Sequence, residues 1–514
     1  MFSSADNFDM GSLAKRPRFD EYSAQISYNY IYNQQFCNFV TPNAPVQQQI
    51  HQPSTNFWLT SEKMKEYLKD EKNLECVLSF SFPKVFKKSY TNENRFIILP
   101  PTIALEGFGW NKFIDGQSSA SKNINIRMEI CGTKKTNQSF MDTIEINDPK
   151  TLAQFQTRKL CITSDEQKNM CRLSADLHLP NGSAIKSIQS GRIKVMSKCS
   201  KKTKVDTSTS GASSFIKNES YIALFIRGPG TVTRYLHCNS AGFSASLKQW
   251  SLFKIYLVDE RTGENEFSYN SEEKYIYYQR NILLVDVVTE MSLPIMKIRK
   301  CEHTKNKVYK FENNFDEPVC PLHIISFEYV DPNGNVLYLG TQNNVGIGWK
   351  SLTDPSKGIN NEVKWNIISA DRYFYRFYPI NGLERITMLN FPIVLTINKA
   401  KIGNEWLEFE GRGLTNDIQV WFNTYPSPQT IYRSSSTIAC IVPTLASYYK
   451  HCSTFGITET LTIPLYLVTS DGTIFPMSFV FVYNAKEVGE IGHVKFVHEI
   501  DRNTIEQPVN CIKY

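Results

Sequence analysis

The chain contains 12 cysteines but no CxxC pair and no cysteine–histidine spacing of the zinc-finger kind. Neither a structural zinc site nor a disulfide framework is therefore predicted, and we expect reduced thiols in an intracellular protein. No charged segment followed by an apolar run opens the chain, and no apolar run reaches the ~18 residues of a membrane span. We expect no membrane segment, no metal and no cofactor.

Catalytic motifs are missing as well. The sequence has no GxSxG elbow, no HExxH motif and no phosphate loop, and Gly228-Pro229-Gly230 is too short to cradle a phosphate. His237 and Cys238 are neighbours, but adjacent residues of a strand point to opposite faces and do not form a nucleophile pair. We therefore expect no enzyme.

With 514 residues the chain is too long for one core, and we expect about three domains. The net charge of +7 permits nucleic-acid binding without requiring it. One amphipathic helix is predicted over Leu59–Glu71, with Thr60 or Ser61 as its N-cap. From Glu75 onward, short β-rich runs such as RFIIL, NINIRMEI, YIYY and TIACIV are broken by Gly, Pro, Asn and Asp. That pattern is typical of successive antiparallel barrels or sandwiches.

Arg95 lies between two asparagines and an apolar run that ends at Pro100-Pro101. Because proline lacks the N–H that a sheet ladder needs, residues 92–95 are expected to form a loop delivered by a strand. A lone arginine on such a loop suits a bidentate contact to a guanine edge, a phosphate contact or a surface ion pair. These residues alone leave the three alternatives open.

Three other segments are basic. Ser190–Lys204 carries six cations and no acid, and a strand is expected to lead into its lysine-rich loop, which is either solvated or neutralised by a polyanion. Lys248-Gln249 lies on a short turn beside Trp250, and an amide at such a turn can read a minor groove. Lys15–Arg18 is a short basic cluster, which either is read by nuclear import machinery or arises by chance.

Several long and rare strings resemble, in the right order, the CSL family, the DNA-binding transcription factors of Notch signalling also called RBP-J or Suppressor of Hairless. They are LTSEKMKEYLK, NENRFIILPP, RIKVMSKCSKK, VTRYLH, FSASLKQW, EFSYN, WNIIS, VWF and IYRSSSTIACIVP. The resemblance runs from residue 57 to residue 483 and marks the chain as a divergent member.

The resemblance implies a mainly β protein. A Rel-homology-like N-terminal DNA-binding domain is expected over 57–214, a β-trefoil-like domain over 215–380 and an immunoglobulin-like (Rel/IPT) C-terminal domain over 381–487. Residues 1–56, which are polar and rich in Ser, Asn and Gln, are expected to be disordered, and residues 488–514 to form a tail.

Functional residues are implied by the same resemblance. The expected DNA-binding residues are Arg95 with its neighbours Glu93 and Phe96, then Lys198, Ser200, Lys201 and Lys202 of the lysine loop, Arg227, and Lys248 and Gln249. In the last pair a lysine replaces one glutamine of the family's Gln-Gln turn, which should strengthen phosphate attraction more than base discrimination.

The family also has a trefoil groove for the hydrophobic-Trp-hydrophobic-Pro motif of Notch. It maps to Phe267, Tyr269, Leu283, Ser292 and Gln342. Phe267 and Gln342 agree with the family, whereas Tyr269 replaces a smaller β-branched residue, Leu283 a lysine and Ser292 an alanine. Added bulk in a packed groove costs ~1 to 3 kcal/mol, so weaker peptide binding is expected.

We therefore expect a nuclear transcription factor that binds a GTGGGAA-like double-stranded site as a monomer and recruits co-activators or co-repressors. The implied partners are a Notch intracellular domain-type peptide, a Mastermind-type co-activator and co-repressors. The alternative is a protein-interaction scaffold with a degenerate DNA surface. A single-strand or RNA binder is more remote, because its usual aromatic platform is not visible.

Overall fold

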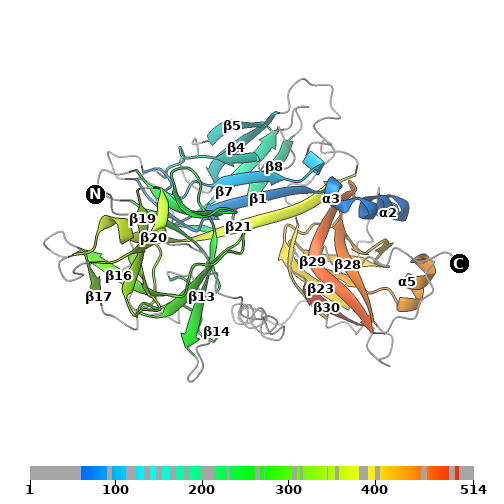
Figure 1. The fold of residues 1–514 in the computed structure, drawn as a ribbon. Coiled ribbons are helices and arrows are strands. Elements are labelled where there is room, and N and C mark those ends of the chain that lie inside the picture. The colour runs from blue at the N-terminus through cyan, green and yellow to red at the C-terminus, as the bar shows by residue number, and fades with distance from the viewer. Residues whose placement is uncertain are drawn as a thin grey trace, which may run out of the picture. The chain divides into compact units, whose positions relative to one another are not determined.

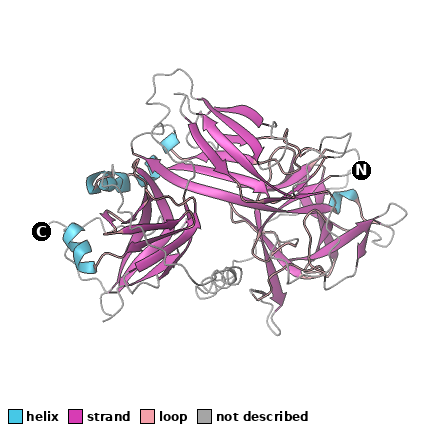
Figure 2. Ribbon diagram, turned by 180° about the vertical axis from the view of Figure 1, so that it is seen from behind, coloured by secondary structure: helices cyan, strands magenta, loops and turns pink. Residues whose placement is uncertain are grey.

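The fold is drawn in Figure 1 from a computed structural model, and strands dominate it when it is seen from behind (Figure 2). The structure describes residues 59–89, 95–110, 123–131, 139–145, 153–162, 169–178, 184–197, 215–227, 232–260, 267–270, 272–303, 309–312, 317–343, 345–352, 358–380, 392–399, 406–452, 460–484 and 492–496. The expected disordered segment 1–56 lies outside these ranges. Within them, no helix has both the length and the apolar character needed to cross a membrane.

The predicted N-terminal helix is confirmed as α2 (Ser61–Lys69), and a second short helix, α3 (Glu71–Leu74), follows it. Thr60 is the N-cap, because its side-chain oxygen accepts from the backbone N–H of Lys63 at 3.4 Å. The apolar positions expected on one face are all buried: Leu59, Met64, Tyr67 and Leu68. They pack in one cluster with Trp421.

The described residues divide into two compact units. The first holds residues 83–87 and 196–371, and the second holds the remaining residues up to 195 and those from 372 onward. The long strand β21 (Trp365–Pro379) contributes its first part to one unit and its last part to the other.

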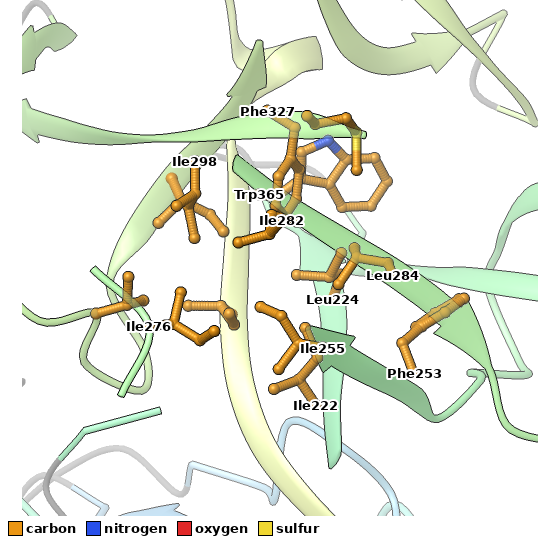
Figure 3. Close-up of a cluster of buried hydrophobic side chains, with 14 of the residues drawn as sticks. Ile222, Leu224, Phe253, Ile255, Ile276, Ile282, Leu284, Ile298, Phe327 and Trp365 are labelled. Carbon is orange, nitrogen blue, oxygen red and sulfur yellow. The ribbon is translucent and has the colours of Figure 1, made fainter. Parts of the chain in front are cut away.

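The first unit is built from short antiparallel strands. They are β2 (Val85–Lys87), β10 (Tyr221–Ile226), β11 (Arg234–Asn239), β12 (Gly242–Ser246), β13 (Phe253–Glu260), β14 (Phe267–Tyr269), β15 (Asn281–Asp286), β16 (Met296–His303), β17 (Tyr309–Glu312), β18 (Ile324–Val330), β19 (Val336–Gln342) and β20 (Gly346–Lys350), with the 3-10 helix η1 (Asn361–Val363). Figure 3 shows the core of this unit, where Ile222, Ile255, Ile282 and Trp365 come from β10, β13, β15 and β21. Alternate residues of these strands therefore point into one shared core.

The N-terminal part of the second unit contains two sheets. Its strands are β1 (Cys76–Pro83), β3 (Thr102–Glu106), β4 (Asn123–Cys131), β5 (Ser139–Glu145), β6 (Ala153–Gln156), β7 (Met170–His178), β8 (Ala184–Gln189) and β9 (Ile193–Met196). β3 pairs with β1 and β6, whereas β7 pairs with β4, β8 and β9. The buried positions of β4 alternate with exposed or partly exposed ones, so one face of that sheet is polar.

The C-terminal part of the second unit is a two-sheet sandwich with one helix. Its elements are β22 (Ile393–Lys399), β23 (Trp406–Arg412), β24 (Gln419–Phe422), β25 (Tyr425–Pro426), β26 (Thr430–Ser434), β27 (Thr437–Ile441), α5 (Leu445–Cys452), β28 (Thr460–Val468), β29 (Thr473–Asn484) and β30 (Gly492–Phe496). One sheet has the order β22-β23-β27-β26, and β29 pairs with β28 and β30 in the other. The expected tail 488–514 therefore includes a strand.

Three elements differ from the sequence-based expectations. The run RFIIL (95–99) is not a strand and forms only a bridge between Phe96 and Cys161. The run YIYY (275–278) likewise forms only bridges, from Tyr275 to Lys217 and from Tyr277 to Pro318. Helix α5 was not predicted, because its tyrosines and histidine are weak helix formers.

Candidate nucleic-acid interface

Arg95 follows residues 90–94, which include Glu93 and lie outside the described residues, so the loop predicted over 92–95 is described only at Arg95. The backbone N–H of Arg95 donates to Oγ of Ser89 at 2.9 Å, and the N–H of Ser89 donates to the carbonyl of Ile162 at 2.8 Å. Ser89 is only 5% exposed, whereas Arg95 is partly exposed. The backbone of Arg95 is therefore fixed by a buried group while the residue itself keeps access to solvent.

Phe96, the neighbour of Arg95, is 53% exposed, which is unusual for a phenylalanine. It forms an antiparallel bridge with Cys161, and the N–H of Ile97 donates to the carbonyl of Leu160 at 2.9 Å. Segment 160–162 thus holds the Arg95-Phe96 pair from one side. A cation and an aromatic ring lie side by side in sequence at the surface, a combination that suits a nucleic acid.

The segment predicted to form the lysine-rich loop follows β9 in the chain. Ile193 and Val195 are buried while Lys194 and Met196 are partly exposed, and these residues form the strand that was expected to lead into the lysine-rich segment. β9 pairs with β7 through Met170 opposite Lys194, so the strand that leads into the loop is fixed in a sheet. The four predicted loop residues lie outside the described part of the chain: Lys198, Ser200, Lys201 and Lys202. Their role stays a prediction.

Arg227 follows directly after β10 and is exposed. β10 pairs with β11 so that Ile226 lies opposite Arg234, which is partly exposed. The two arginines therefore lie at the same end of this strand pair. Two such cations suit contacts to the phosphates of a duplex, which position a protein without reading its sequence.

Lys248 and Gln249 form a turn after β12, as the sequence predicted. The hydroxyl oxygen of Ser246 accepts from the N–H of Lys248 at 3.2 Å and from the N–H of Gln249 at 3.0 Å. Both residues are exposed, and the preceding Leu247 is 40% exposed. One serine hydroxyl thus sets the backbone of both residues, a common device in turns.

Three protein-family models match the chain. Residues 78–209 match the model described as LAG1, DNA binding, residues 239–366 match the beta-trefoil DNA-binding domain, and residues 391–483 match a TIG domain. The human protein named recombining binding protein suppressor of hairless-like protein is 28% identical over 426 residues, which cover 80% of each chain. The mouse protein of the same name is 27% identical over 415 residues, 78% of each chain. The chain belongs to the CSL family.

The matched models confirm the predicted fold class of this CSL protein: an N-terminal DNA-binding domain, a β-trefoil and a C-terminal TIG domain, in a chain made mainly of strands. Among solved structures, the binding domain of botulinum neurotoxin serotype G matches 58% of this chain and 84% of that domain, with 10% identity and a TM-score of 0.17. A similarity this weak supports no statement about the fold.

Three of the residues predicted to line a peptide groove lie around β13: Tyr269, Leu283 and Ser292. Val258 pairs with Tyr269 of β14, and Tyr256 pairs with Leu283 of β15. Because cross-strand partners and residues two apart share a face, these four side chains lie on one side of the sheet, opposite the core. Ser292 bridges to Val285, two residues beyond Leu283, and joins the same face.

Tyrosine rings occupy part of this face. The rings of Tyr256 and Tyr269 lie 4.9 Å apart, and Nζ of Lys254 lies 4.8 Å from the centroid of the Tyr256 ring. Burial raises the pKa of Tyr269, so its phenol stays neutral and packs as an apolar surface. The protein therefore fills with its own aromatic pair a position where a smaller side chain would leave space.

The other two residues predicted for the groove, Phe267 and Gln342, lie at strand ends. Phe267 begins β14, opposite Glu260 of β13, and Gln342 ends β19, opposite Gly346 of β20. Gln342 is exposed, and its amide lies over Gly348, where an added Cβ would come within 2.1 Å of Nε2. Glycine at position 348 is therefore needed for this placement of the amide.

Sequence reasoning missed the two serines that hold the backbone of the candidate DNA-contacting residues. Ser246 lies two residues before Lys248, a spacing at which a hydroxyl commonly accepts from a turn amide, so a local signal was present. Ser89 lies six residues before Arg95 and bonds to Ile162, which is distant in sequence, so no local pattern identifies it.

Proposed function

We propose that this CSL protein, a DNA-binding transcription factor of the Notch pathway, recognises a GTGGGAA-like duplex with Arg95 as a guanine-reading residue. The observation that carries the proposal is the fixed backbone of Arg95, whose amide is held by the buried hydroxyl of Ser89. A guanidinium that starts from a fixed backbone makes a bidentate contact to guanine O6 and N7 at lower entropic cost. Phe96 and Glu93 flank this contact.

The other candidate residues have supporting roles in the proposal. Lys198, Ser200, Lys201 and Lys202 set affinity from the lysine loop, with Lys198 also reading a guanine edge. Arg227 contacts phosphates, and the turn of Lys248 and Gln249 lies at the minor groove. The protein acts in the nucleus as a monomer on DNA, catalyses no reaction, and recruits co-activators or co-repressors.

Arg95→Ala is expected to cost about 1 to 3 kcal/mol of binding free energy on a duplex with the GTGGGAA core and much less on a scrambled duplex. The difference arises because base contacts carry sequence discrimination whereas phosphate contacts do not. Gel-shift titration of both duplexes at one fixed salt concentration measures it. Arg127→Ala is the matched control, because Arg127 is an exposed arginine on β4 that pairs with Glu129 at 3.5 Å.

An equal loss on the two duplexes would show that Arg95 contributes only charge. A wild-type protein that binds neither duplex better than the other would favour the second candidate function, a protein-interaction scaffold with a degenerate DNA surface.

The altered trefoil face is expected to bind a Notch-type tryptophan peptide weakly, and Tyr269→Val is expected to recover about 1 to 3 kcal/mol of affinity. Valine removes the ring that lies 4.9 Å from Tyr256 and reopens that position. Isothermal calorimetry with the peptide compares the two proteins. Val336→Ala, which trims a 45% exposed side chain on β19, is the control. Strong binding by the unaltered protein would contradict the expectation.

Mastermind-type co-activators and co-repressors remain proposed partners on family grounds. The tyrosine pair is expected to weaken binding of a Notch peptide. The candidate DNA-contacting residues in the described part of the chain are exposed or partly exposed.

A further inference from the structure

The backbone ladder beside Arg95 is interrupted at one point. Phe96 pairs with Cys161, and the N–H of Ile97 donates to the carbonyl of Leu160. In a continued antiparallel ladder, the next bond would run from the N–H of Arg95 to the carbonyl of Ile162. That bond is replaced, because the carbonyl of Ile162 accepts from the N–H of Ser89 at 2.8 Å instead.

The amide of Arg95 then needs another acceptor, because an unpaired backbone N–H in a partly buried position is costly. Ser89 supplies it, with Oγ 2.9 Å from the Arg95 nitrogen. The backbone N–H of Ser89 therefore occupies the carbonyl that Arg95 would use, and the side chain of Ser89 provides the Arg95 amide with another acceptor. The result is that the chain leaves the ladder at Arg95.

We propose that Ser89 is a positioning residue for sequence recognition: its hydroxyl fixes where the chain turns out of the ladder and hence where the Arg95 guanidinium meets a base edge. This inference rests on the proposed guanine-reading role of Arg95. Ser89 is 5% exposed and its Oγ accepts from the backbone N–H of Arg95, so it acts through Arg95 and does not touch the DNA.

Loss of the hydroxyl should change recognition more than stability. In Ser89→Ala the bonds from Ser89 to Ile162 and from Ile97 to Leu160 remain, because both use backbone atoms. Only the amide of Arg95 loses its partner. It must then turn to water or to a shared carbonyl, and a bidentate base contact tolerates little displacement of its starting point.

The test measures the ratio of dissociation constants for scrambled and GTGGGAA duplexes in the full-length protein. Ser89→Ala is expected to lower that ratio about threefold to tenfold, the effect of one hydrogen bond. Affinity for the scrambled duplex and the salt dependence should stay unchanged. Ser89→Thr retains a hydroxyl and is expected to restore the ratio. Thr430→Val is the matched control, since Thr430 is 7% exposed and its hydroxyl accepts from the N–H of Val420 at 3.1 Å in the C-terminal domain.

Hydrogen exchange gives a second readout that does not depend on DNA. The amide of Arg95 is expected to exchange slowly in the wild type and in Ser89→Thr, and quickly in Ser89→Ala. Fast exchange in the wild type would overturn the inference even if the alanine variant failed to fold. So would equal losses by Ser89→Ala on both duplexes. If Arg95→Ala lowers the ratio but Ser89→Ala does not, this inference fails and the proposed function stands. If the wild-type protein binds both duplexes equally well, the inference and the proposed function both fail.

Discussion

Replacement of Lys300 by methionine is expected to lower the free energy of unfolding by about 3 to 5 kcal/mol, because it leaves a buried carboxylate without its cation. Nζ of Lys300 lies 2.8 Å from Glu302, 2.6 Å from Glu312 and 2.8 Å from Glu317. The side chains of Lys300 and Glu317 are only 11% and 3% exposed. Burial alone would lower the pKa of Lys300, but hydrogen bonds to Glu302, Glu312 and Glu317 outweigh it and hold the pKa above its usual value.

Urea denaturation of the full chain measures this loss. Lys310→Met on β17 is the control, because Lys310 is exposed and its replacement should change the free energy by less than about 0.5 kcal/mol. Adding Glu317→Leu to the methionine variant should recover part of the loss, since no deeply buried carboxylate then remains. A methionine variant as stable as the wild type would contradict the account.

The pH dependence of the free energy of unfolding tests the same interaction. The hydrogen bond from Lys300 holds the pKa of Glu302 below its usual value of 4.5. A group with a depressed folded pKa contributes stability that is present above its unfolded pKa and lost as the pH falls through the folded pKa. In Lys300→Met this hydrogen bond to Glu302 is absent, so the variant lacks that contribution at every pH. The stability deficit of the variant should therefore shrink as the pH falls below 4.5 through the folded pKa of Glu302.

Trp365→Ala is expected to cost about 3 to 5 kcal/mol of unfolding free energy, the range for a large aromatic removed from a packed core. Trp365 is fully buried, and Figure 3 shows it beside Phe327 and Ile282. Its indole N–H donates to the carbonyl of Leu339 at 2.9 Å, so alanine leaves both a cavity and an unpaired acceptor. Urea denaturation of the full chain checks it.

Trp365→Phe separates the two contributions. Phenylalanine retains much of the ring volume but not the N–H. The loss of unfolding free energy should therefore be smaller than with alanine, and the difference between the two variants measures the contribution of the cavity. Equal losses in the two variants would mean that the hydrogen bond, and not the volume, dominates. A loss below about 1 kcal/mol for alanine would show that the core around β21 rearranges to fill the space.

Sequence patterns predicted the helices and strands that are determined by neighbouring residues. The alternation of Ile124, Ile126 and Met128 in β4 is sufficient to mark a half-buried strand, and the cap at Thr60 marks the start of α2. The run RFIIL is apolar but does not form a strand. Its pairing stops at Arg95 for a non-local reason, because Ser89 occupies the carbonyl of Ile162 that a ladder through Arg95 would need.

In the candidate interface, too, local features were predicted from the sequence and contacts between distant segments were not. Arg95, Lys248 and Gln249 were found from their residue types and from a family resemblance, since exposed cations and amides on turns are visible in sequence. The groups that hold their backbones were not found. A hydroxyl such as that of Ser89 is identified only when the segments 89, 95–97 and 160–162 are brought together by folding.

Strand β30 has a practical consequence for choosing where a fragment of this protein should end. The matched TIG domain stops at Tyr483, but β30 pairs with β29 beyond it, with Tyr483 opposite Gly492 and Phe479 opposite Phe496. An added Cβ at Gly492 would lie 2.2 Å from the carbonyl of Val482, so the two strands approach closely there. A recombinant piece cut at the domain limit would leave the amides and carbonyls of β29 open to intermolecular pairing and precipitation, and a terminus after Phe496 avoids that hazard.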